Sequence, residues 1–206
     1  MRNYSITVDT DTNDLFRDDN EESHLAKQCL QDNIREIKLQ PYQQGIDQLC
    51  GIYSLINATR LVIRPMRIKA ELLSRCFTTL VQKKRSHDFI TNGTYVTYVS
   101  YMLKEIFIKE YPIKTSKPFR QKVPLEIYWD KLTEFLEKEN RAVVMLFYTA
   151  SAGHWTVIRE ITETQLILFD SKKTRNLKKE ICTTTELSES KTRIIIPTMS
   201  FLIQKS

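Results

Sequence analysis

The spacing of apolar residues divides the chain into a helical first part and a strand-rich second part. Apolar residues recur at helical spacing in five segments, and Pro41 and Pro65 interrupt the pattern after the first two. The predicted helices cover about 22–37, 49–64, 67–82, 95–109 and 127–139. A connection rich in lysine and proline joins the last two of them.

The periodicity changes after residue 140. Short runs rich in valine, isoleucine, leucine and aromatic residues predict strands. These strands cover 141–148, 155–161, 165–169 and 193–196. Helices first and an antiparallel sheet afterwards indicate an α+β fold, in which the helical part packs on the sheet.

Composition and charge set the domain organisation. Residues 1–25 carry seven acidic side chains with little periodicity, so we expect a mobile acidic arm. The remaining 26–206 suit one globular domain, because domains usually contain roughly 100–200 residues and 41% of this chain is hydrophobic. No apolar run is long enough to span a bilayer, and no Sec-type signal is predicted. We therefore expect synthesis in a cytoplasm, which is compatible with export by a non-Sec route.

The charge and the cysteines restrict the partners. A net charge of +6 and a pI of 9.1 fit either an acidic substrate surface or a nucleic acid. The basic runs at 83–85 and 172–179 are more typical of solvated loops, so we expect no nucleic-acid partner. The four cysteines form no C-x-x-C pair and have no histidine at metal-ligand spacing, so neither a metal nor a cofactor is predicted. The sequence carries no signal for an oligomeric state.

Cys50 is the candidate nucleophile. It lies where a loop enters a predicted helix, and there unpaired N–H groups and the helix dipole stabilise a thiolate. A small buried cysteine at a helix start is the alternative interpretation, and position does not exclude it. Three of the four glycines lie in or beside Gln44–Gly51 and Gly153–Trp155, which links this cysteine to one histidine.

His154 and Asp170 complete the candidate site. His154 precedes an apolar strand, and Asp170 ends the predicted return strand sixteen residues later. An antiparallel hairpin of this length places the carboxylate beside the imidazole, where it orients the ring and stabilises the imidazolium. His154 is then the general base. We expect Trp155 to pack in the core or to shield this pair rather than to line a substrate groove.

Gln44, six residues before Cys50, is a candidate oxyanion-hole donor together with the Cys50 backbone N–H, with Gln43 and Gln48 as competitors. The string Gln44-Gly45-x4-Cys50-x3-Ser54 resembles the nucleophile segment of papain-like cysteine peptidases. It is most similar to the bacteriocin-processing (double-glycine leader) peptidases, although Leu49 stands where those carry aspartate. His154-Trp155 and Asp170-Ser171 are also similar to motifs of ubiquitin-like-protein proteases, but here the cysteine comes first.

The resemblance implies a papain-like fold and a cysteine peptidase that acts on a protein or peptide through a thioester acyl-enzyme. Two alternatives stay open. The same residues would support glutamine deamidation or transglutamination, as in some papain-like bacterial effectors. A non-enzymatic protein-binding module is the third interpretation.

Overall fold

Both described helices of the first part lie within predicted segments, but α3 (Leu72–Gln82) begins at Leu72 rather than at residue 67, and α2 (Cys50–Val62) ends at Val62 rather than at residue 64. The computed structural model describes residues 39–45, 47–64, 68, 71–82 and 94–206. Helix α2 begins at the candidate nucleophile, and α3 ends at the predicted position. The predicted helix over 22–37 and the predicted acidic arm over 1–25 lie outside the described residues.

The two remaining helical segments also match the prediction, with differences in detail. Segment 95–109 forms α5 (Val96–Met102), a π-helical turn (Leu103–Phe107) and α6 (Ile108–Glu110). Helix α7 (Leu125–Leu136) begins at Leu125 rather than at residue 127, because Pro124 precedes it and a proline is well tolerated where a helix starts. Two short 3-10 turns follow at Lys179–Ile181 and Pro197–Met199.

The strands of the described chain form one sheet of eight. They are β1 (Ile113–Ser116), β2 (Arg141–Tyr148), β3 (Gly153–Ile161), β4 (Gln165–Leu168), β5 (Asn176–Lys178), β6 (Cys182–Thr183), β7 (Arg193–Ile195) and β8 (Phe201–Lys205). The main order is β1-β8-β2-β3-β4-β5, while β7 pairs with both β2 and β6. Every pair is antiparallel apart from β6 and β7. The predicted α+β class is confirmed.

Four strands fall outside the predicted segments. β1 lies in the stretch interpreted as a connection, and β1 and β5 each bury a single apolar residue, Ile113 and Leu177. So few apolar positions give no detectable alternation. β6 is only two residues long. β8 buries three consecutive apolar residues, and that signal was present in the sequence.

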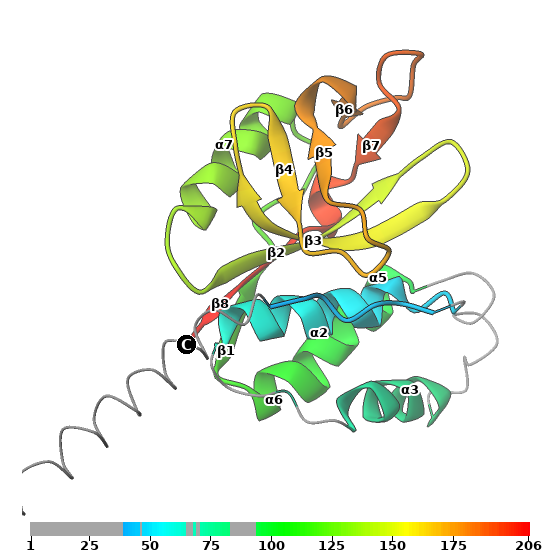
Figure 1. The fold of residues 1–206 in the computed structure, drawn as a ribbon, viewed down its shortest axis with the longest axis vertical. Coiled ribbons are helices and arrows are strands. Elements are labelled where there is room, and N and C mark those ends of the chain that lie inside the picture. Colours follow the sequence, from blue (N-terminus) through cyan, green and yellow to red (C-terminus); the bar gives the residue numbers. More distant parts are fainter. Residues whose placement is uncertain (1–38, 46, 65–67, 69–70, 83–93) are drawn as a thin grey trace, which may run out of the picture. The chain divides into compact units, whose positions relative to one another are not determined.

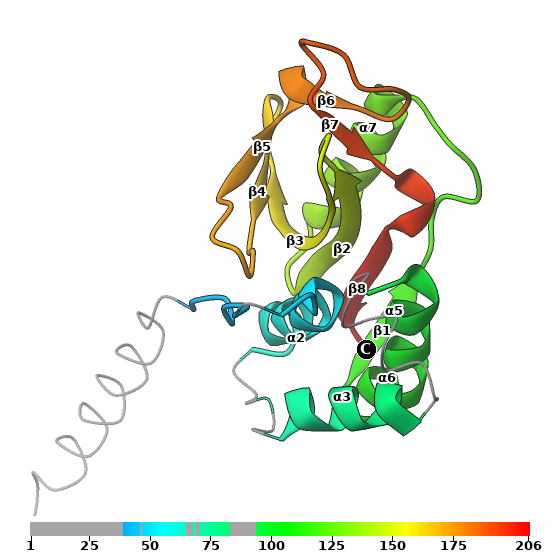
Figure 2. The same ribbon diagram turned by 90° about the vertical axis from the view of Figure 1, so that its right-hand side faces the viewer.

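Helices pack on both faces of the sheet (Figures 1 and 2). Alternate residues of β2, namely Val143, Met145 and Phe147, join the core cluster beneath α7. The intervening residues Val144 and Leu146 are also buried, and α2 contacts β2 and β3. A strand buried on both faces explains why β2 reads as a continuous apolar run. No helix among the described residues is long and apolar enough to cross a membrane.

Candidate active site

Cys50 is the first residue of α2 and is 7% exposed. The backbone N–H groups of Ile52 and Tyr53 both donate to Leu49 O, and those of Cys50 and Gly51 come too early in the helix to have a partner within it. Gly51 lets this end of the helix pack closely, because a Cβ at Gly51 would lie 2.6 Å from the Thr94 side chain. The carbonyl of Thr94 in turn accepts a hydrogen bond of 2.6 Å from Trp155 Nε1. Thr94 therefore connects the start of α2 to β3.

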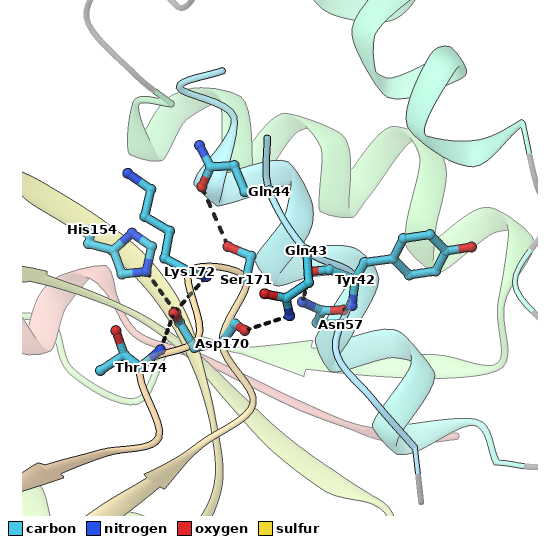
Figure 3. Close-up of polar contacts among 9 residues, drawn as sticks. All are labelled: Tyr42, Gln43, Gln44, Asn57, His154, Asp170, Ser171, Lys172 and Thr174. Atoms are coloured by element: carbon cyan, nitrogen blue, oxygen red, sulfur yellow. Dashed lines mark hydrogen bonds and ion pairs between the residues drawn. The ribbon is translucent and has the colours of Figure 1, made fainter. Parts of the chain in front are cut away.

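His154 and Asp170 form a buried pair. Nε2 of His154 lies 2.7 Å from Oδ1 of Asp170 (Figure 3). His154 is the second residue of β3, and Asp170 comes two residues after the last residue of β4. The two residues are 9% and 2% exposed. The predicted hairpin therefore brings these two side chains together.

A β-bulge sets which face of the hairpin carries Asp170. Near the turn, Ile161 pairs with Leu166 and Glu160 with Ile167, and beyond the bulge Ile158 pairs with Leu168. Continued regularly from the turn, this ladder would place Asp170 opposite Val157, on the face away from His154. The extra residue shifts the register by one, as the hydrogen bond from Phe169 N to Val157 O shows. Because side chains alternate along a strand, that shift brings Asp170 to the His154 face.

The Asp170 carboxylate is fully engaged. Its Oδ2 accepts hydrogen bonds from the backbone N–H groups of Lys172 (2.8 Å) and Thr174 (3.2 Å). Burial would raise the pKa of Asp170, but the bond to His154 and the other donors outweigh it and hold the pKa below 3.8. The nearby Thr156 hydroxyl also contributes to lowering the pKa of Asp170. It is buried and makes no hydrogen bond of standard geometry with a described residue. Asp170 is therefore a carboxylate at neutral pH.

The pKa of the His154 ring is raised, which favours its protonated form at neutral pH. Burial alone would lower the pKa of His154, but the interactions with Asp170 and Cys50 outweigh burial and raise the pKa to about 9. Nδ1 is buried and has no hydrogen-bond partner of standard geometry among the described residues. Because Nε2 faces Asp170, Nδ1 is the nitrogen left for the thiol. Cys50 is among the groups that raise the pKa of His154, so the thiol lies near the ring.

The other described cysteines differ from Cys50. Cys76 and Cys182 are both fully buried. Burial raises the pKa of the Cys76 thiol to about 12 and that of the Cys182 thiol to about 11. Neither thiol has a histidine partner in the part of the chain that the structure describes, and burial keeps both protonated at physiological pH. Cys29 lies outside the described residues.

The loop before Cys50 is bonded to the segment that carries Asp170. The Gln44 backbone N–H donates to Ser171 O (3.0 Å), and Ser171 Oγ lies 3.5 Å from Gln44 Oε1. Gln43 Nε2 donates to Asp170 O over 3.4 Å (Figure 3). The Gln44 amide nitrogen donates within its own loop, to Asp47 O. The structure thus places Gln44 beside the Asp170–Ser171 segment and leaves its second amide hydrogen for another acceptor.

Side chains of helix α2 form hydrogen bonds with this loop. The fully buried Asn57 accepts from Tyr42 N (2.7 Å) and donates to Tyr42 O (3.2 Å). Closer to the nucleophile, Asp47 accepts from the Leu49 backbone N–H (2.9 Å) and from the Tyr53 hydroxyl (3.3 Å). Both contacts fix where the loop enters the helix.

Two aromatic residues complete the surroundings of His154. Phe147 pairs with His154 across β2 and β3, and its ring meets the imidazole edge-on with centroids 5.6 Å apart. Trp155 is 2% exposed, so it packs in the core as the sequence predicted. The roles of Gln43, Asn57 and Thr156 were not predicted. Thr156 could have been predicted, because it lies two residues after His154 and residues two apart on a strand share a face. The contacts of Gln43 and Asn57 are tertiary, so no local pattern indicates them.

The described residues contain no cluster of side chains suited to a metal ion. A cavity lined by residues of β1, β8 and α7, including Lys114, Lys131 and Gln204, lies away from the pair. Comparison with models of known families, with curated proteins and with solved structures finds no match for this chain.

Proposed function

We propose that this chain is a papain-like cysteine peptidase that cleaves a protein or peptide substrate. One observation carries the proposal: the buried His154 ring is bonded to Asp170 through Nε2, and Cys50 is among the groups that raise the pKa of this ring. A nucleophile, a base and an orienting group in this order are the elements of nucleophilic acyl transfer.

In the first half of the reaction, the Cys50 sulfur attacks the carbonyl carbon of the scissile bond. His154 holds the thiol proton as an imidazolium, which Asp170 stabilises. The tetrahedral intermediate collapses when the carbon–nitrogen bond breaks and the Nδ1 proton passes to the leaving amine. A thioester between the substrate acyl group and Cys50 remains.

Hydrolysis of the thioester regenerates the enzyme. His154, now neutral, takes a proton from a water molecule that attacks the thioester carbonyl. The carbon–sulfur bond then breaks, and the sulfur leaves as a thiolate beside the imidazolium. If Cys50 attacks the side-chain amide of a glutamine, ammonia leaves, and hydrolysis of the resulting thioester by water gives deamidation. If an amine attacks that thioester in place of water, the result is transglutamination.

The charge that develops on the carbonyl oxygen needs donors. The Cys50 backbone N–H opens α2 and has no partner within the helix. The second amide hydrogen of Gln44 is the other candidate donor. The contacts of Gln44 with Asp47 and Ser171 support this role because they fix the amide before a substrate arrives. The motif around Cys50 resembles that of papain-like peptidases, and a nucleophile helix packed on an antiparallel sheet agrees with that resemblance.

The proposal is tested by incubating the full chain with a proteome-derived peptide library and identifying new termini by mass spectrometry. Wild type is expected to generate new termini, and Cys50→Ala is expected to generate none. Thr59→Ala, which alters a buried residue of the same helix with no bond to the loop, serves as a control for folding.

Each other outcome has a defined meaning. Equal cleavage by wild type and Cys50→Ala would contradict the proposal. A mass gain of about one dalton on glutamine-containing peptides, without fragments, would identify deamidation instead. The absence of any Cys50-dependent change would favour a binding module.

A further inference from the structure

The turn after Asp170 carries three exposed basic side chains, Lys172, Lys173 and Arg175. None of the three has an ion-pair partner among the described residues. We call residues 172–175 the basic turn. From the sequence these residues read as part of a solvated loop, but the structure adds that this loop begins at the residue bonded to His154.

The basic turn has a fixed conformation. Asp170 Oδ2 accepts from the backbone N–H groups of Lys172 and Thr174, and Leu168 N donates to Arg175 O over 2.8 Å. Lys173 has a φ of 67°, in the left-handed region that non-glycine residues rarely occupy. The carboxylate that orients His154 therefore also shapes this turn. The backbone positions from which the three basic side chains extend are therefore fixed relative to Asp170.

The charges around the turn are not balanced locally. On the nucleophile loop, the carboxylate of Asp47 is engaged by Leu49 N and the Tyr53 hydroxyl. Asp170 faces His154 and the backbone of the turn. Figure 3 shows the Lys172 side chain leaving the turn in the direction of the Gln44 side chain. The rim of the site is therefore positively charged on this side.

We propose that the basic turn selects substrates with aspartate or glutamate close to the scissile bond. The inference rests on the proposed peptidase function and adds a substrate class to it. An extended substrate advances about 3.3–3.6 Å per residue, so acidic residues within roughly three positions of the bond pass the turn. Their carboxylates form ion pairs with the exposed cations, and these pairs weaken as salt is added.

The test compares cleavage of a proteome-derived peptide library by the full-length wild type and by a triple variant, Lys172→Gln, Lys173→Asn and Arg175→Gln. Asparagine at position 173 tolerates the left-handed conformation. Wild-type cleavage sites are expected to be enriched in aspartate and glutamate within three positions of the bond, and the triple variant is expected to lose that enrichment. For a cleaved peptide and its Glu→Gln counterpart, the triple variant should lower kcat/KM about tenfold for the acidic peptide and little for the neutral one.

The matched control removes the same charge elsewhere, with Lys114→Gln, Arg120→Gln and Lys138→Gln. These residues are exposed and lie on β1, in the following loop and after α7. The control variant is expected to retain the acidic preference. If it loses the preference to the same extent, overall charge explains the selectivity and the basic turn does not.

Failure of this inference is distinguishable from failure of the proposed function. Cys50-dependent cleavage without acidic enrichment would overturn the inference and leave the peptidase intact. An enrichment that persists in the triple variant would also overturn it. Absence of any Cys50-dependent cleavage would overturn both.

Discussion

At the scale of single residues, the proposed chemistry depends on the two nitrogens of His154. Nε2 lies 2.7 Å from Asp170 Oδ1, so Nδ1 is the ring nitrogen that remains available to the thiol. Burial opposes a charged ring, yet the pKa of His154 is raised to about 9 because Asp170 and Cys50 outweigh burial. The raised pKa favours a protonated His154 ring at neutral pH.

This charge state predicts how Asp170→Asn changes the pH profile. Amide replacement removes the charge that raises the His154 pKa, so the loss of activity at high pH should begin well below pH 9. Peptidase activity at neutral pH should also fall, roughly 10²- to 10⁴-fold, as for loss of general acid–base function. The measurement is kcat/KM against pH for both proteins. Superimposable profiles would show that Asp170 does not set the state of the ring.

At the scale of elements, the site depends on how closely α2 approaches Thr94 and β3. Gly51→Ala should be strongly destabilising, because the new Cβ meets the branched Thr94 side chain at 2.6 Å inside the core. A cost of about 1–3 kcal/mol in the free energy of unfolding is expected.

Gly153→Ala is the matched comparison. Its Cβ would meet the Tyr148 ring at 2.7 Å, but Tyr148 is 41% exposed and can move aside. Urea unfolding of both variants measures the difference. A larger loss in Gly153→Ala than in Gly51→Ala would contradict the packing described for α2.

The loop before the nucleophile depends on a buried side chain of α2. Asn57→Ala removes both bonds to Tyr42, so the loop that carries Gln44 should lose its fixed position. We expect kcat to fall by more than the loss of folded protein accounts for. Thr59→Ala removes a bond to Leu55 O inside the same helix and should lower stability, by about 1 kcal/mol, without changing kcat. Equal effects of the two variants on kcat would remove Asn57 from the positioning of the loop.

The hairpin shows how far sequence reasoning reaches at this scale. The spacing between His154 and Asp170 predicts their contact, and the strand residues around them predict the pairing. The bulge between Ile158 and Glu160 could not be predicted from the sequence, because the exposed Arg159 is compatible with either register. β1 and β5 were missed for a related reason: each buries a single apolar residue, and its pairing partner stabilises it. The contacts of Gln43 and Asn57 join segments distant in sequence, so local pattern could not predict them.

At the scale of the whole molecule, the buried pair makes stability depend on pH. The folded pKa of His154 lies near 9, above the ordinary 6.5, so the folded state binds more protons between these values. The contribution is fully present below pH 6.5 and is lost as pH rises through about 9, by at most about 1.4 kcal/mol per pH unit. For Asp170 the folded pKa is lowered, so its contribution is present above pH 3.8 and is lost as pH falls through the folded pKa.

Urea unfolding at several pH values, in wild type and in His154→Gln, isolates this effect. The difference in unfolding free energy between the two proteins should shrink between pH 6.5 and 9, because other groups cancel in the comparison. A difference that stays constant over that range would mean that the ring is not charged in the folded protein.

The central claim is that Cys50 is a nucleophile activated by His154, and the rate of its alkylation by iodoacetamide tests this most directly. Peptide mapping by mass spectrometry separates the signal of Cys50 from those of Cys76 and Cys182. At neutral pH we expect Cys50 to react far faster than Cys76 and Cys182, and His154→Ala to slow the reaction of Cys50 by at least about tenfold. Equal rates for Cys50 in wild type and His154→Ala would contradict this claim.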